Sequence, residues 1–198
     1  PIMLSSNSIR IKGPAELSGN HRFSVPGDIS SAAFFSVAAC IIPASRLQIR
    51  NVLLNPTRTG FIKVLRRMGA RIEEKVISDK WEPYGDISIQ SSELCATEIV
   101  ADEVPYLIDE LPVLAVAMAF ARGRSRVTGA GELRHKETDR IRDLIGQFKL
   151  AGINCCELID GFEIEGPANI SRNACLDSCH DHRLAMSLSI MALASPNG

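Results

Sequence analysis

The sequence has 198 residues, of which 45% are hydrophobic and 23% are charged, and its formal net charge is −1. These values are ordinary for a globular protein, and the lack of a basic excess argues against a nucleic-acid partner. The longest apolar runs, such as residues 113–121, are too short to span a bilayer, so no membrane association is expected. Residues 1–4 lack the pattern of a secretory signal, and we therefore expect a cytoplasmic protein.

Two segments of the chain show the same predicted order of elements. The first begins at Asp28, a helix-capping residue, and continues as helix, strand, helix and two strands. The second adds a short strand in front and repeats that order, and both second helices end at glycines, Gly69 and Gly152. The predicted elements span residues 28–39, 46–52, 59–68, 71–76 and 86–90, then 97–101, 107–121, 125–128, 138–151, 153–157 and 162–165.

The first helix of each segment is apolar on nearly all sides, whereas the second helix has a polar face. We therefore expect the first helices to be buried at the centre, with the sheets outside. Another apolar helix, over residues 181–194, begins a third unit that is then cut off. The pattern predicts a mixed α/β fold made of repeated βαβαββ units around buried inner helices.

Clusters of ionisable residues stand at the starts of three apolar helices. The densest is RHKETDR at residues 134–140, in which Lys136 and Arg140 have the i,i+4 spacing of one helix face, with Glu137 beside them. Because helix N-termini attract anions, converging helix starts with cations would build one anion pocket. Charged helix starts are also common as solvated faces, and spacing alone leaves that alternative open. The other two clusters span residues 109–112 and 180–183.

The six cysteines are irregularly spaced and two of them are adjacent, so a secreted disulfide framework is not expected. Cys175, Cys179, His180 and His182 offer an alternative zinc site. One compact cluster without a second pair of ligands is a weak signal for zinc, and free thiols are the preferred interpretation.

Five segments carry a resemblance to a known family over essentially the whole chain. The sequence resembles the 5-enolpyruvylshikimate-3-phosphate synthases (EPSP synthases), the shikimate-pathway enzymes that glyphosate inhibits. The pairing of KETDR with DHR in this order is the most specific part of the resemblance. The segments are VPGDISSAAFF at 25–35, NPTRTGFIKVLRRMGA at 55–70, IDELPVLAVAMAFARG at 108–123, RHKETDR at 134–140 and HDHRLAM at 180–186.

The resemblance implies one lobe of a two-lobed fold, an inside-out α/β barrel (alpha-beta prism) lobe whose inner helices start at the cleft. Residues 1–26 correspond to the last strands of the other lobe and the hinge, and residues 27–198 to the C-terminal lobe. That lobe has two full βαβαββ units, 27–92 and 97–166, and a truncated third. Motifs of the first lobe are missing, so we expect a fragment with half a site whose partner is the N-terminal lobe.

The family's reaction, by resemblance, moves the enolpyruvyl group of phosphoenolpyruvate to the 5-hydroxyl of shikimate 3-phosphate and releases phosphate. It needs no metal and no organic cofactor. Guanidinium forks suit carboxylate and phosphate groups. The resemblance assigns phosphoenolpyruvate binding to Lys136, Arg140, His182 and Arg183, and shikimate 3-phosphate binding to Asp109, Glu132 and Lys136.

Three of these residues are implied to be catalytic. Asp109 would help to deprotonate the attacking hydroxyl, Lys136 would stabilise developing charge, and Glu137 would move protons at the methylene carbon. The residues themselves leave structural roles open. Asp109 also fits a helix cap, Glu137 fits a carboxylate that satisfies the helix dipole, and both arginines fit salt bridges.

Other functions remain as alternatives. The enolpyruvyl transferase that acts on UDP-N-acetylglucosamine shares the fold but lacks the KETDR and DHR pairing in this form. RNA 3′-phosphate cyclase has related repeats, and the near-neutral charge argues against it. A non-catalytic lobe that binds only anions or a partner chain is the third alternative.

Overall fold

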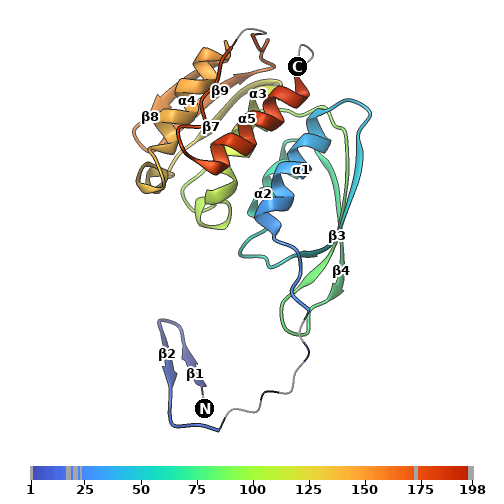
Figure 1. Ribbon diagram of the computed structural model, residues 1–198, viewed down its shortest axis with the longest axis vertical. Coiled ribbons are helices and arrows are strands. Elements are labelled where there is room, and N and C mark those ends of the chain that lie inside the picture. The colour runs from blue at the N-terminus through green and yellow to red at the C-terminus, as the bar shows by residue number, and fades with distance from the viewer. Residues whose placement is uncertain (1, 17–18, 20–21, 23, 172–173, 196–198) are drawn as a thin grey trace.

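The computed structural model describes residues 2–16, 19, 22, 24–171 and 174–195. The chain begins with an antiparallel hairpin of β1 (Ile2–Ser5) and β2 (Ser8–Ile11), which lies apart from an α/β body in Figure 1. All the residues of these two strands are exposed. Four aliphatic side chains share one face of the hairpin, because Ile2 pairs with Ile11 and Leu4 pairs with Ile9.

The first part of the body contains an antiparallel sheet with the strand order β3-β5-β4. Gly27 forms a parallel bridge to Val52 at the edge of this sheet. The predicted helix, strand, helix and two strands are confirmed in this order. They are α1 (Ile29–Ile41), β3 (Arg46–Leu53), α2 (Gly60–Arg67), β4 (Arg71–Ser78) and β5 (Tyr84–Gln90).

The second part repeats the order around a sheet arranged β6-β7-β9-β8. Here β6 runs parallel to β7, and the remaining pairs are antiparallel. The parallel bridge of Gly27 to Val52 in the first part occupies the place that β6 has in the second. The elements are β6 (Glu98–Ile99), α3 (Leu111–Phe120), β7 (Gly123–Val127), α4 (Arg140–Leu150), β8 (Asn154–Leu158) and β9 (Gly161–Gly166).

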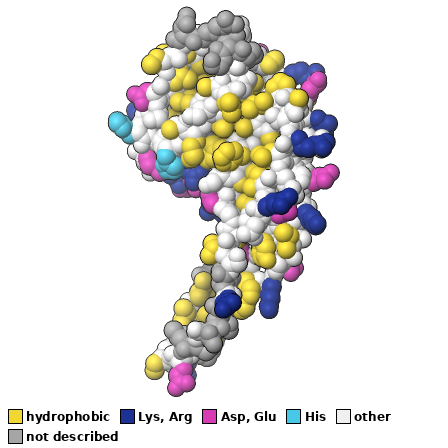
Figure 2. Space-filling model, turned by 45° about the vertical axis from the view of Figure 1, so that its right-hand side comes forward, with side chains coloured by type: hydrophobic (Ala, Val, Ile, Leu, Met, Phe, Trp, Pro, Cys, Tyr) yellow, Lys and Arg dark blue, Asp and Glu magenta, His cyan; other side chains and the backbone are white. Residues whose placement is uncertain are grey.

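The core of the body is formed by α1, α3 and α5 (His182–Ala194), which contact one another and lie side by side in Figure 1. Residues 111–119 of α3 are all buried, and most of α1 is buried too, as the sequence predicted. By contrast, α5 has one buried face and exposes Met186 and Leu193, and α1 exposes Phe35. Figure 2 shows hydrophobic side chains gathered on the face of the body that it presents.

Two predicted helix starts are wrong. The helix predicted from residue 107 begins at Leu111, and 3-10 turns at Val104–Tyr106 and Ile108–Glu110 precede it. Pro112 explains this, because its nitrogen cannot donate to the carbonyl of residue 108 and its ring occupies that space.

The helix predicted from residue 138 begins at Arg140 and follows a 3-10 turn at Gly131–His135. Asp139 caps it by accepting a hydrogen bond from the Arg142 backbone N–H, and this fixes the start. Lys136 therefore lies outside the helix, and the prediction that it shares a helix face with Arg140 is wrong.

No helix in the described part of the chain is long and apolar enough to cross a bilayer.

Candidate anion-binding site

The N-terminal ends of α3, α4 and α5 bring three charged side chains together. The guanidinium of Arg183, in the first turn of α5, donates from Nη1 to the Asp109 main-chain oxygen at 3.0 Å. Its Nη2 lies 3.5 Å from Asp109 Oδ2. Arg140, which begins α4, places Nη1 3.6 Å from Asp109 Oδ1. Two arginines that are distant in the sequence therefore approach the same carboxylate.

Arg140 is 1% exposed, and a buried charge of this kind requires partners. Its Nε donates to Asp181 Oδ2 at 2.5 Å, and its Nη2 donates to Glu137 Oε2. Its Nη1 has no hydrogen-bond acceptor among the described residues. This buried nitrogen of the guanidinium therefore has Asp109 as an ion-pair partner at 3.6 Å but makes no hydrogen bond.

Asp181 joins the helix start to this arginine. Its carboxylate caps α5 by accepting hydrogen bonds from the backbone N–H groups of Arg183 at 2.7 Å and Leu184 at 3.2 Å. Burial by itself raises the pKa of Asp181, but the hydrogen bond from Arg140 and those from the backbone outweigh it and hold the pKa below its ordinary value. Asp181 is therefore an ionised partner that fixes Arg140.

Glu137 and His182 lie beside the two arginines at a more exposed position. The Glu137 carboxylate binds Arg140 through Oε2, and its Oε1 lies 3.8 Å from Nδ1 of His182. The side chains of Glu137 and His182 are 45% and 62% exposed, so both are accessible to a ligand.

Lys136 and Glu132 form a separate ion pair. Lys136 Nζ donates to Glu132 Oε1 at 2.7 Å, with the Glu132 side chain 68% exposed. Both residues belong to or follow the 3-10 turn that precedes α4. The ion pairs and hydrogen bonds thus join the two arginines with Asp109, Glu137 and His182, whereas Lys136, the residue before Glu137, pairs with Glu132.

Arg134 has a structural role in this loop. It donates to the main-chain oxygens of Leu158 and Ile159 and pairs with Asp139 and Glu157. These contacts tie the loop before α4 to the end of β8. Arg134, a cation of the RHKETDR segment, therefore stabilises the loop before α4 and is not itself part of the site.

Glu110 is a site residue that sequence reasoning did not single out. It is 2% exposed at the start of α3, and its Oε1 lies 3.9 Å from Nη1 of Arg183. Burial raises its pKa. The signal available in the sequence was an acidic residue directly before a fully apolar helix, and this pattern is also typical of an ordinary helix start.

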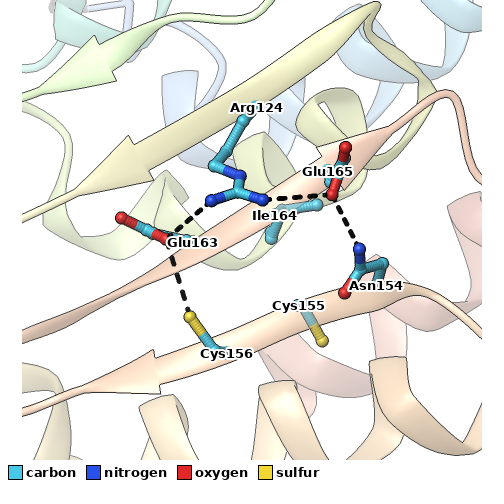
Figure 3. A pocket seen from close by; sticks show the side chains of 7 residues that line it. All are labelled: Arg124, Asn154, Cys155, Cys156, Glu163, Ile164 and Glu165. Atoms are coloured by element: carbon cyan, nitrogen blue, oxygen red, sulfur yellow. Dashed lines mark hydrogen bonds and ion pairs between the residues drawn. The ribbon is translucent and has the colours of Figure 1, made fainter.

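A cavity on the second sheet is lined by residues of β7, β8 and β9 and by none of the residues described above (Figure 3). Its polar groups are already paired with one another. Arg124 lies 3.4 Å from Glu165, Asn154 donates to Glu165 at 2.7 Å, and the Cys156 thiol approaches Glu163 at 3.7 Å. These cross-strand pairs stabilise the sheet and leave no free cation for an anionic ligand in this cavity.

Among the described side chains, no group of three or more His, Cys, Asp or Glu residues is arranged to hold a metal ion. Cys175, Cys179, His180 and His182 therefore do not form the alternative zinc site. All six cysteines are unpaired.

Arginines gathered at helix N-termini form a site that suits an anionic ligand. Residues 2–197 match the family of EPSP synthases (3-phosphoshikimate 1-carboxyvinyltransferases). The chain therefore belongs to the EPSP synthase family.

Individual relatives agree with this assignment. The chain is 48% identical over 188 residues to the 3-phosphoshikimate 1-carboxyvinyltransferase of Carboxydothermus hydrogenoformans, with 94% of the chain and 44% of the relative covered. It is 45% identical over 199 residues to that of Petrotoga mobilis, covering 99% of the chain and 46% of the relative. The structure of an EPSP synthase from Acinetobacter baumannii superposes with a TM-score of 0.92 at 40% identity, covering 99% of the chain and 46% of that structure. The chain thus spans less than half the length of these relatives.

Proposed function

We propose that this chain forms part of an enolpyruvyl transferase that joins phosphoenolpyruvate to the 5-hydroxyl of shikimate 3-phosphate and releases phosphate. The observation that carries the proposal is the approach of Arg140 and Arg183, from two different helices, to Asp109. The relatives that bear this activity are more than twice as long, so the proposal assigns the other half of the site to a second lobe.

The proposal includes a finer description of the fold. The body is one lobe of an inside-out α/β barrel, made of two full βαβαββ units and the first inner helix of a third. The repeated element order and the packing of α1, α3 and α5 against one another support it. Residues 1–26 belong to the other lobe and the hinge, and the exposed apolar face of the β1–β2 hairpin supports this boundary.

Arg140, Arg183 and His182 hold phosphoenolpyruvate in the proposed site. Arg140 offers a buried Nη1 without an acceptor among the described residues, and Arg183 is 16% exposed in its side chain. Two guanidiniums fit the carboxylate and the phosphate of this ligand. Lys136 binds the bridging oxygen and the shikimate hydroxyl, which requires its Nζ to leave Glu132, and Glu132 contacts shikimate 3-phosphate.

Proton transfer falls to the carboxylates. In the addition step the 5-hydroxyl oxygen bonds to C2 of phosphoenolpyruvate, its proton passes to Asp109, and the methylene carbon gains a proton from Glu137. In the elimination step that carbon returns a proton to Glu137, the C2–O bond to the phosphate breaks, and the leaving phosphate takes up the proton that Asp109 accepted. Lys136 stabilises the charge that develops on oxygen. The exposure of the Glu137 carboxylate, 45%, supports its access to the ligand.

The site is proposed to work in the cytoplasm, and the unpaired state of all six cysteines supports a reducing compartment.

Separate changes of the two carboxylates test the proposal, in the protein that carries both lobes. Glu137→Gln should lower kcat by about 10²–10⁴-fold with little change in shikimate 3-phosphate affinity, because it removes proton transfer and its ion pair is with Arg140, a proposed phosphoenolpyruvate ligand. Asp109→Ala should lower both kcat and the affinity for shikimate 3-phosphate, because Asp109 also binds the hydroxyl groups of that substrate. Steady-state phosphate release and calorimetric titration measure the two quantities.

Glu74→Gln is the matched control for the loss of one carboxylate. Glu74 lies on β4, outside the site, and pairs with Arg66 of α2. Near-normal turnover of Glu137→Gln would show that Glu137 is only a helix-start carboxylate. Turnover with UDP-N-acetylglucosamine in place of shikimate 3-phosphate would favour the sister transferase. An absence of turnover with either acceptor would favour a non-catalytic lobe.

A further inference from the structure

Glu110 is a buried carboxyl group that the proposed reaction does not use. It ends the 3-10 turn before α3 and is 2% exposed. Although it stands at the N-cap position of α3, its side chain makes no capping hydrogen bond, and its Oε1 has no hydrogen-bond partner among the described residues. Ser30 hydrogen-bonds to the Glu110 carboxyl group, but the buried Oε1 stays unpaired, and leaving a buried acceptor unpaired is costly.

Groups from four parts of the fold face Glu110. They are Ser30 in the first turn of α1, Arg58 in the loop before α2, Asp109 next to it in the chain, and Arg183 in the first turn of α5. Arg58 Nη2 donates to Ser30 Oγ at 2.9 Å, so Arg58 already has an acceptor. Arg183 Nη1 is the closest cationic nitrogen in the recorded ion pairs of Glu110, at 3.9 Å from Oε1.

The guanidinium of Arg183 is shared among competing acceptors. Nη1 donates to the Asp109 main-chain oxygen at 3.0 Å, which leaves Glu110 at 3.9 Å from the same nitrogen. An anion that binds Arg183 would add negative charge within a few ångströms of Glu110. In a buried setting such like-charge repulsion is weakly screened, so an ionised Glu110 opposes the ligand more than an exposed carboxylate would.

We propose that Glu110 is a positioning residue whose carboxylate competes with the bound anion for Arg183, so that protonation of Glu110 tightens anion binding. The inference rests on the proposed function, because it takes Arg183 as an anion ligand. It adds a proton-coupled control of affinity by a residue that does not touch the substrate.

The coupling is reciprocal. If protonation of Glu110 strengthens anion binding by some factor, the bound anion must favour protonation of Glu110 by the same factor. Burial already raises the pKa of this carboxyl group, while the hydrogen bond with Ser30 and the charges of Arg183 and Arg58 lower it. In the pH range in which Glu110 of the unliganded protein ionises, anion binding is therefore accompanied by proton uptake. At higher pH Glu110 is ionised in both states, and the affinity for the anion is lowest.

Calorimetric titration of the 198-residue chain with sulfate, over a series of pH values, tests the proposal. Sulfate is a dianion that does not titrate in this range. Glu110→Gln keeps the shape of the side chain and removes the charge. In the alkaline part of the series it should bind sulfate about tenfold more tightly than the wild type, and in acid the two should converge.

The other charged groups of the site are common to both proteins, so their contributions cancel in the comparison. Glu74→Gln serves as the control for a loss of one carboxylate and should follow the wild type at every pH. Glu110→Ala provides a second variant, which should show the same flattened pH dependence even if the lost side-chain volume lowers stability.

The outcomes separate this inference from the proposed function. If Arg183→Ala abolishes sulfate binding but Glu110→Gln binds like the wild type at every pH, the inference is overturned and the anion site stands. If the wild type fails to bind sulfate, or Arg183→Ala binds it unchanged, the anion site on Arg183 is overturned and the inference falls with it.

Discussion

Arg140 and Asp181 show which properties of single residues can be inferred from the sequence. Both stood in charged clusters at helix starts, and the clusters correctly indicated where charge gathers. Their direct pairing, at 2.5 Å between Nε and Oδ2, could not be inferred, because it depends on how α4 and α5 pack in three dimensions. The spacing of Lys136 was misleading for a local reason, since the cap at Asp139 excludes it from the helix.

Replacement of Asp181 by Asn should destabilise the protein by about 3–5 kcal/mol at neutral pH, because it removes the only fully buried carboxylate among the described ion-pair partners of the buried Arg140. Asn still caps a helix, so the cap itself is largely retained. The pKa of Asp181 in the folded protein lies below its ordinary value of 3.8. Its contribution is therefore complete above that value and is lost as the pH falls through the lowered pKa. Urea unfolding at neutral and acidic pH measures both effects.

Asp28→Asn is the matched control for this change. Asp28 caps α1 through the backbone N–H groups of Ser30 and Ser31, and no ion pair to an arginine within 4.0 Å is recorded for it in the described part of the chain. Asp28→Asn should therefore lower the free energy of unfolding by much less than Asp181→Asn does. Equal losses from the two variants would mean that Asp181 acts only as a cap.

At the scale of elements, hydrophobic periodicity located nearly every helix and strand of the body. Positive φ angles at Gly69 and Gly152, 100° and 83°, explain why both second helices end where the glycines predicted. The 3-10 turns before α3 and α4 were missed, because short turns have no periodicity of their own. Those turns carry Asp109, Glu110 and Glu132, so the least predictable backbone bears part of the site.

Gly146 offers a test of how far helix propensity limits the stability of α4, the helix that presents Arg140. A Cβ atom added at Gly146 would meet nothing within 4 Å. Gly146→Ala should therefore raise the free energy of unfolding by about 0.5–1 kcal/mol. Urea denaturation followed by circular dichroism gives the value.

Gly161→Ala should have the opposite effect, because its Cβ would lie 2.0 Å from the main-chain oxygen of Val127 in the paired strand. A loss of stability in Gly146→Ala would indicate that α4 has no room for a methyl group and that its packing is tighter than the structure shows.

At the scale of the whole molecule, the packing of α1, α3 and α5 explains why residues from distant parts of the chain meet. The inner helices begin at the same end of the body, so Ser30, Glu110 and Arg183 face one another. The repeat in the sequence predicted that inner helices would be buried, but a repeat does not specify which side chains touch. Contacts such as those of Asp109 with both arginines had to come from the three-dimensional arrangement.

Deletion of residues 1–25 should change the free energy of unfolding of the body by less than about 0.5 kcal/mol, because the β1–β2 hairpin is exposed throughout and surface changes have small effects. Deletion of residues 1–28 is the matched control. It also removes Gly27, whose N–H donates to Asn51 O at 2.7 Å and whose oxygen accepts from Leu53 N at 2.9 Å, and the α1 cap Asp28. Loss of the cap alone costs about 0.5–2 kcal/mol. Urea unfolding of both variants measures the difference. An equal loss in the shorter deletion would place part of residues 1–25 within the folded body and contradict the proposed boundary.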